Sequence, residues 1–277
     1  MMAGILMDLK NGRKNMASIK KFKMVSINYT NACAKKPRCS FCYLKKAELF
    51  QRLKEESGLE EKRPFRNAYM PSELFQWLDK TEQIAIAFNG LGIAMLNELL
   101  RTCQTQIKER KLIVNITTNP EFLVQQIVAL FKRWKVKMVA LSLDPEKCSL
   151  DLWIEKAKLL KEYGIKVGAN ILMLDEVFPG VSKTLERIHK LCYQIHLLRP
   201  KFYKTKISLE KRKELIWLLK QKYKNLFIDE CFKWEFTGEP CSRGKDFISI
   251  NADGTTSLCS FDIYRNNLKN LKKCPFI

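Results

Sequence analysis

Short apolar runs alternate with longer amphipathic stretches along most of the chain. The short runs are rich in β-branched residues and apolar nearly throughout. This pattern is typical of strands that are buried on both faces of a parallel sheet. The predicted strands cover residues 22–29, 83–88, 111–117, 137–143, 165–173, 194–198 and 225–231.

The segments between these runs show helical periodicity, with apolar residues recurring about every 3.6 positions. Pro71 and Ser72 suit the start of a helix, and Gly164 suits the end of one. Alternation of strands and helices predicts a parallel α/β fold, and six or seven units predict a partial (β/α)6-type TIM barrel, open on one side. The predicted helices cover residues 43–55, 71–80, 94–110, 120–134, 149–164 and 208–223.

The pattern changes after about residue 230, where the helical periodicity stops. Residues 247–251 and 255–259 flank an Ala-Asp-Gly turn, which predicts a β-hairpin. We therefore expect two parts: a barrel over residues 1–230 and a small cysteine-rich hairpin module over residues 231–277.

The composition fits a folded protein, since 46% of the 277 residues are hydrophobic. No stretch approaches the ~18 uncharged apolar residues of a membrane span, and the apolar run at the N-terminus is too short for a signal peptide. We expect a cytoplasmic protein that is not bound to a membrane. The net charge of +21 is compatible with an anionic partner such as nucleic acid, but a solvated lysine-rich surface is the stronger explanation.

Ten cysteines are many for such a chain. Without an export signal, disulfides are a poor explanation, so metal binding is favoured. Three of these cysteines, Cys33, Cys39 and Cys42, lie between the first predicted strand and the first predicted helix. In parallel α/β folds, active sites lie at that end of a strand. Three thiolates can hold three irons of a [4Fe–4S] cluster and leave the fourth iron open to a ligand, while a zinc site with a distant fourth ligand is the alternative.

The loop resembles the cluster-binding motif of the radical S-adenosylmethionine (radical SAM) superfamily. The usual motif is C-x3-C-x2-C, whereas this chain has C-x5-C-x2-C, with a longer first gap. Phe41 precedes the third cysteine, where the family places an aromatic residue beside the adenine of SAM. The resemblance therefore implies that Cys33, Cys39 and Cys42 hold the cluster to which SAM binds.

Other motifs with the same resemblance follow successive strands. The sequence NGLGIAMLNELL is similar to the glycine-rich turn that holds the amino group of SAM, although Ile93 and Ala94 replace its glutamate and proline. TNP and SLDP are similar to motifs after the third and fourth strands. Taken singly, each motif is explained as well by a helix cap or a strand–helix corner. Together they imply SAM contacts by Phe41, Gly90, Gly92, Thr118, Asn119, Ser142, Asp144, Gly168 and Asn170.

The C-terminal cysteines have a spacing of their own. Cys241, Gly254 and Cys259 form C-x12-G-x4-C, which resembles the first half of the SPASM or twitch extension of radical SAM enzymes. In that resemblance, Cys231 and Cys274 complete the ligands of one auxiliary [4Fe–4S] cluster in the shorter, twitch form. A zinc-binding hairpin is the alternative.

The remaining cysteines and the histidines carry weaker signals. Cys103, Cys148 and Cys192 are expected to pack in the core as small hydrophobic residues. Cys148 also lies near the predicted active-site end and is a minor candidate for catalysis. His189 and His196, the two histidines, belong to no recognisable triad or metal motif.

The resemblance implies an enzyme that reductively cleaves SAM and uses the 5′-deoxyadenosyl radical to remove a hydrogen atom from its substrate. A peptide or protein is the expected substrate, and a nucleic acid or nucleotide is the alternative. An electron donor such as flavodoxin or ferredoxin is a further expected partner. A hypothesis from a different class is a non-enzymatic, zinc-binding nucleic-acid module.

Overall fold

The computed structural model describes residues 23–28, 33–34, 78, 81–109, 111–143, 148–201, 204–239, 246–250, 256–257 and 259. The predicted site residues Cys39, Phe41, Cys42, Asp144, Cys241 and Cys274 lie outside these ranges. So do the helix predicted over residues 43–55 and all but Leu78 of the helix predicted over residues 71–80.

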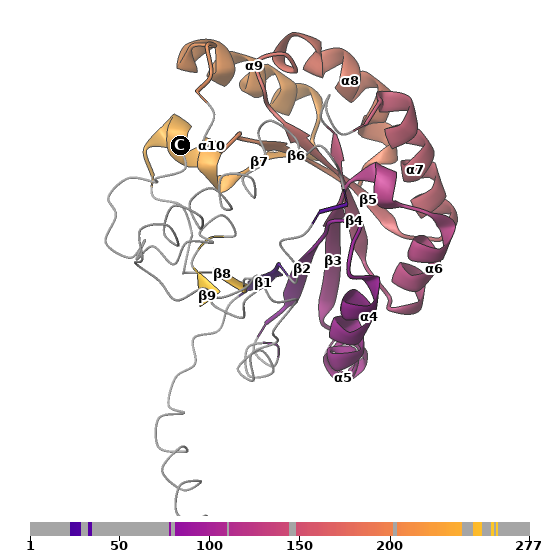
Figure 1. Cartoon of the computed structure of the whole chain (residues 1–277). Coiled ribbons are helices and arrows are strands. Elements are labelled where there is room, and N and C mark those ends of the chain that lie inside the picture. The colour runs from indigo at the N-terminus through magenta and orange to yellow at the C-terminus, as the bar shows by residue number, and fades with distance from the viewer. Residues whose placement is uncertain are drawn as a thin grey trace, which may run out of the picture.

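One curved sheet forms the centre of the described structure, with the helices on its convex side (Figure 1). Its strand order is β7-β6-β5-β4-β3-β2-β1-β8-β9, and every neighbouring pair is parallel except β8 and β9. A parallel α/β partial barrel is therefore confirmed. The strands are β1 (Met24–Ile27), β2 (Gln83–Phe88), β3 (Ile113–Thr118), β4 (Met138–Leu143), β5 (Lys166–Leu172), β6 (Gln194–Leu198), β7 (Leu226–Ile228), β8 (Phe247–Ile250) and β9 (Thr256–Ser257).

Three of the described helices begin at a residue whose side chain caps the first turn. The side chains of Ser149, Ser208 and Asp229 each accept a hydrogen bond from a backbone N–H in the first turn of α7, α9 and α10. The helices are α4 (Ile93–Thr102), α5 (Gln104–Glu109), α6 (Gln125–Arg133), α7 (Leu150–Glu162), α8 (Val181–Ile188), α9 (Leu209–Lys222) and α10 (Glu230–Thr237), with 3-10 turns η1 (Pro120–Phe122), η2 (Phe178–Gly180) and η3 (His189–Leu191).

The two faces of the sheet differ in composition. The outer face is apolar and packs on the helices: Phe88 meets Phe131 of α6 edge to face at 6.1 Å between ring centroids, and the indole N–H of Trp153 in α7 donates to the Leu141 carbonyl at 3.4 Å. The inner face, which points away from the helices, instead carries small or polar side chains over its middle. These side chains, in register across four strands, are Ala85, Ala87, Asn115, Thr117, Ala140 and Gly168.

All seven predicted strands are present, and β2 and β6 cover the residues expected for them. Two helices were not predicted. Helix α8 has buried apolar residues at helical spacing, but Pro179 and Gly180 directly before it suggest a loop. Helix α10 begins inside the segment where the periodicity was expected to stop, because Asp229 caps it after a strand of only three residues.

The predicted C-terminal hairpin also appears, as the antiparallel pair of β8 and β9. Its first strand pairs with β1, with Val25 beside Ile248 and Ile27 beside Ile250. The described hairpin residues therefore extend the barrel sheet. No helix in the described ranges is long and apolar enough to cross a membrane.

Candidate active site

Cys33 lies at the carboxyl end of β1, next to the turn that follows β2. The N–H of its neighbour Ala34 donates to the carbonyl oxygen of Asn89 at 3.0 Å. The following residue, Gly90, has φ of +79°, and a Cβ there would lie 2.6 Å from Cδ1 of Phe122 and 2.9 Å from Cβ of Ala34. The predicted glycine turn and the first cysteine of the predicted cluster loop are thus adjacent, at a spacing that only glycine permits.

Gly92 also adopts a left-handed conformation, with φ of +70°, and it is the residue from which α4 starts. Two positive φ values within three residues let the chain turn from β2 into α4 while its backbone stays at the strand end. Both predicted glycines are therefore needed for the shape of this turn. A glycine turn of this kind exposes backbone groups to a ligand.

Thr118 and Asn119 end β3 in the same region. The Thr118 hydroxyl donates to the carbonyl oxygen of Phe88 at 2.8 Å, so it ties β3 to β2. Asn119 is only 7% exposed, and its Oδ1 has no hydrogen-bond partner within the described part of the chain. A buried carbonyl oxygen without a donor is unfavourable by about 1–3 kcal/mol, so a ligand that donates a hydrogen bond here would be stabilised.

The strand register assembles a row of inward-facing side chains at the carboxyl ends, which we call the carboxyl-end row. Ser142 pairs with Asn170, Asn170 with His196, and His196 with Phe227. Thr118 pairs with Leu141, which places Asn119 next to Ser142 at the other end of the row. The row therefore consists of Asn119, Ser142, Asn170, His196 and Phe227. Three of these residues were predicted from sequence; His196 and Phe227 were not.

His196 is held by the last strand of the barrel. Its imidazole stacks on the Phe227 ring at 5.4 Å between centroids, with 25° between the planes. Burial lowers the pKa of His196 below its ordinary value, while the nearby Asp229 carboxylate acts in the opposite direction. His196 is therefore an uncharged imidazole at neutral pH.

Two further residues singled out in the sequence, Gly168 and Cys148, lie next to the carboxyl-end row. A Cβ on Gly168 would lie 3.2 Å from Cβ of Ala140, so strands β4 and β5 approach closely beneath Asn170. The thiol of Cys148 donates to the carbonyl oxygen of Ser142 at 3.8 Å. Cys103 and Cys192 are buried in the core, as expected, and the described cysteines form no disulfide.

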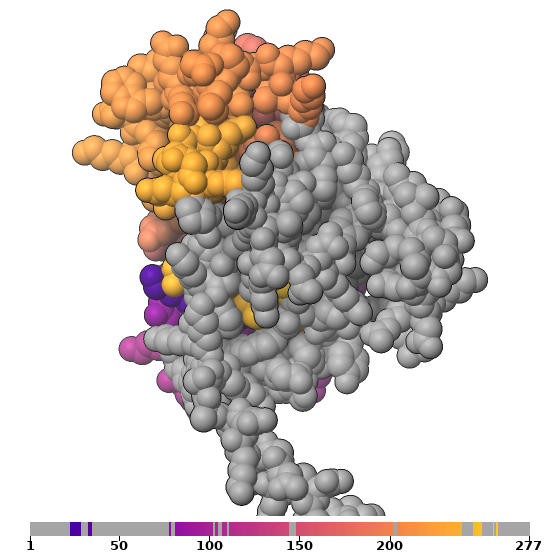
Figure 2. All heavy atoms as spheres, turned by 90° about the vertical axis from the view of Figure 1, so that its left-hand side faces the viewer, coloured from indigo at the N-terminus to yellow at the C-terminus, as the bar shows by residue number. Residues whose placement is uncertain are grey.

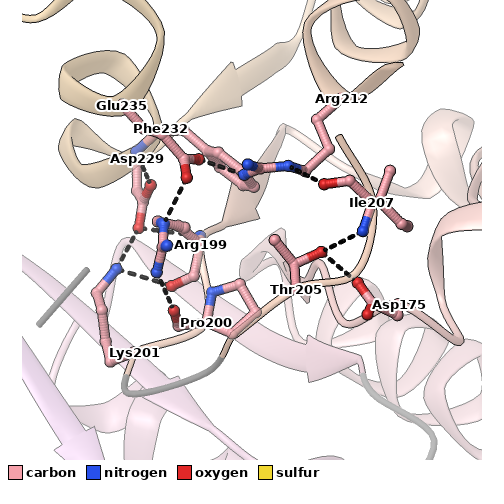
Figure 3. Close-up of polar contacts among 10 residues, drawn as sticks. All are labelled: Asp175, Arg199, Pro200, Lys201, Thr205, Ile207, Arg212, Asp229, Phe232 and Glu235. Atoms are coloured by element: carbon pink, nitrogen blue, oxygen red, sulfur yellow. Dashed lines mark hydrogen bonds and ion pairs between the residues drawn. The ribbon is translucent and has the colours of Figure 1, made fainter. Parts of the chain in front are cut away.

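A network of buried charges fixes α10 at the end of the barrel (Figure 3). Lys201 Nζ lies 2.9 Å from Asp229 Oδ2, and Arg199 Nε lies 3.3 Å from Glu235 Oε1. Arg212 of α9 also pairs with Glu235, so α9 and α10 lie together at the surface (Figure 2). These three cations are almost completely buried, and each has a carboxylate partner.

The same network places Cys231, a predicted ligand of the auxiliary cluster, in the first turn of α10. Burial alone would lower the pKa of Lys201, but Asp229 and Cys231 raise it above its ordinary value, and Lys201 hydrogen-bonds to the Cys231 side chain. Cys259 follows β9, where its carbonyl oxygen accepts a hydrogen bond from Ser257 at 2.8 Å. Within the described ranges, no three cysteine, histidine or acidic side chains gather as a metal site.

No protein-family model matches this sequence, and no curated protein is detectably similar to it. Several solved structures are similar in fold. Streptococcus suis SuiB bound to S-adenosylmethionine superposes with a TM-score of 0.66 at 17% identity, over 89% of this chain and 62% of SuiB. The native anSMEcpe with bound AdoMet and a peptide gives 0.55 at 14%, over 87% of this chain and 74% of that one.

Methylornithine synthase (PylB) is also similar, with a TM-score of 0.55 at 13% identity over 85% of this chain and 74% of that one. The SuiB and anSMEcpe structures contain bound S-adenosylmethionine. This chain shares the parallel α/β partial-barrel fold of these structures. At such low identity the likeness establishes the fold, and this chain spans less than two thirds of SuiB.

The described part of the site is compatible with the cluster and the SAM that the sequence motifs imply. Cys33 supplies a thiol at a strand end and the Gly90 turn offers close-approaching backbone. The unpaired Oδ1 of Asn119 offers an acceptor for an ammonium or hydroxyl group. Thiolates are the ligands of a [4Fe–4S] cluster, and Cys33 is the one predicted ligand of the first cluster that lies within the described ranges.

Proposed function

We propose that this chain is a radical SAM enzyme that acts on a peptide or protein. One observation carries the proposal: the Ala34–Asn89 hydrogen bond and the Gly90 contact bring the cysteine loop and the glycine turn together at the carboxyl ends of β1 and β2. A structural zinc site has no need of a glycine turn packed against the residue that follows one of its ligands.

Each predicted residue then has a role. Cys33, Cys39 and Cys42 hold the [4Fe–4S] cluster, and Phe41 lies beside the adenine of SAM. Backbone groups around Gly90 and Gly92 hold its ammonium in place of the missing glutamate. Asn119, Ser142, Asp144 and Asn170 bind its polar groups, while Thr118 and Gly168 shape the strand ends. When bound, the cluster and SAM supply the radical that removes a hydrogen atom; the protein aims it and excludes water.

A second [4Fe–4S] cluster is proposed at the C-terminal end, held by Cys231, Cys241, Cys259 and Cys274. In this proposal, residues 1–230 form the radical SAM barrel, and residues 231–277 form the twitch-like part that completes it. The charge network supports it, because Lys201 and its partners fix Cys231 in position. The cluster would accept an electron from the substrate or bind it. A flavodoxin or ferredoxin in the cytoplasm would reduce the first cluster.

The peptide substrate rests on the relatives in fold, since anSMEcpe is solved with a bound peptide. A nucleic acid is the second candidate, because the chain carries a net charge of +21. The two candidates differ in what the carboxyl-end row must recognise.

The test is anaerobic incubation of the iron-loaded chain with SAM and dithionite, followed by chromatography for 5′-deoxyadenosine. We expect its formation, and its loss in Cys33→Ala. A colourless, zinc-containing chain, or an iron-loaded chain that forms no 5′-deoxyadenosine, would refute the proposal and favour the zinc-binding module.

A further inference from the structure

His196 and Phe227 form the end of the carboxyl-end row that lies farthest from Cys33 along the sheet. In Figure 1, β6 and β7 stand across the barrel opening from β1 and β8. Phe227 lies on the inner face of the sheet with its register partner His196, and its side chain is 47% exposed. The Phe227 ring stacks on the His196 imidazole next to the polar side chains of the row, so an apolar face and hydrogen-bonding groups lie together, as they do in ligand-binding sites.

The charges near His196 and Phe227 bear on whether the substrate is a peptide or a nucleic acid. The nearby cations Arg199, Lys201 and Arg212 are buried and paired with Asp229 and Glu235. The row itself is uncharged: it consists of two amides, a hydroxyl, a phenyl ring and a neutral imidazole. Among the described residues, a phosphate placed here would lose its hydration without gaining an unpaired cation from the row or from these three residues, which is strongly unfavourable.

The available groups instead suit an uncharged planar group. The Phe227 ring offers an apolar face, on which an amide plane or an aromatic side chain can lie. The neutral imidazole of His196 has one donor and one acceptor nitrogen, so it can bind a carbonyl oxygen or an amide N–H of the same group. A peptide presents both features at every residue.

We propose that His196 and Phe227 form the substrate-side subsite of this enzyme, and that the subsite takes an uncharged amide or aromatic group of a peptide and rejects phosphate. The inference deepens the proposed function and rests on it. It assigns roles to two residues that no cofactor motif includes.

The subsite is testable because the chain has only two histidines, His189 and His196. The anaerobically prepared full chain, labelled with ¹³C-histidine, would be titrated with N-acetyl-phenylalanine methylamide and with inorganic phosphate. We expect the imidazole signal of His196 to shift with the amide and not with phosphate. His189, whose Nδ1 lies 3.0 Å from the Leu185 carbonyl, would not respond, and His189→Gln assigns the two signals.

Two substitutions at Phe227 distinguish the loss of the ring contact from a loss of folding. Phe227→Ala should weaken amide binding about tenfold, the size expected for one lost aromatic contact, and Phe227→Leu should weaken it less. Since Phe227 is half exposed, both variants should fold, which the melting temperature checks. A shift with phosphate, or no shift with either probe, would overturn the subsite.

The titration requires no turnover, so its result is independent of 5′-deoxyadenosine formation. A chain that makes 5′-deoxyadenosine but shows no amide response refutes the subsite alone. A chain that responds to the amide but never cleaves SAM refutes the proposed function.

Discussion

The N–H of Ala34 donates to the carbonyl oxygen of Asn89 at 3.0 Å. This single bond joins the loop that begins the predicted cluster motif to the turn that begins the predicted SAM motif. The two residues are far apart in sequence, but parallel pairing of β1 with β2 brings their carboxyl ends together. The arrangement makes the glycine turn a structural support of the cysteine loop as well as a candidate ligand-binding element.

Gly90→Ala should damage both functions of this turn. The new Cβ would lie 2.6 Å from Phe122 in a left-handed backbone, so we expect a loss of about 3 kcal/mol in the free energy of unfolding. Gly164→Ala is a matched control, because Gly164 has a similar φ of +75° but nothing within 4 Å of a new Cβ. It should cost only about 1 kcal/mol. Urea denaturation measures both losses, and equal losses would show that the packing at Gly90 is unimportant.

Glu235→Gln should destabilise the attachment of α10. Glu235 is the carboxylate partner of both Arg199 and Arg212, and its replacement leaves two buried guanidinium groups without a full countercharge. We expect a loss of about 3 kcal/mol in urea denaturation. The exposed pair of Glu186 with Lys222 gives the control, since Glu186→Gln should produce no measurable change. Comparable stability of the two variants would mean that the buried network contributes little.

His196 should make the folded state sensitive to mild acid. Its pKa is lowered by burial, so the unfolded chain binds a proton more readily than the folded chain below about 6.5, the ordinary value. The stability is therefore complete above that pH and decreases as the pH falls through the folded pKa. His196→Gln should remove this part of the decrease. Urea titrations of both proteins at pH 5 and pH 8 measure it, and identical pH dependence would contradict the buried, neutral imidazole.

Cys103 and Cys192 should resist alkylation in the native protein. Burial raises the pKa of each thiol to about 12, so almost no thiolate is present at pH 8. Mass spectrometry after brief treatment with iodoacetamide should find both unmodified, and all ten cysteines modified after denaturation. Rapid labelling of either residue in the folded chain would mean that its core packing is looser than described.

The strands were predictable from sequence because each is a short, largely apolar run, and the residues that face the helices are buried. The positions of Asn119, Ser142 and Asn170 followed from motifs at the strand ends. His196 was missed because nothing in its local sequence marks it. Its role depends on the register that pairs it with Asn170 and Phe227, and register is set by the whole sheet.

The end of the barrel was less predictable for a related reason. Helix α10 and the pairing of β8 with β1 both occur where the apolar period is lost. Helix α10 is stabilised by the Asp229 cap and by the ion pairs of Glu235 with two arginines. Arg199 directly follows β6, and Arg212 lies on α9. Interactions between distant charged residues leave no periodic trace in the sequence.

The most direct test of the central claim is electron paramagnetic resonance of the reduced chain with and without SAM. The claim is that Cys33, Cys39 and Cys42 leave one iron without a protein ligand. SAM should then change the g values of the [4Fe–4S] signal, and Cys33→Ala should abolish that response. A spectrum that SAM leaves unchanged, in a chain with intact clusters, would contradict an open iron and with it the proposed enzyme.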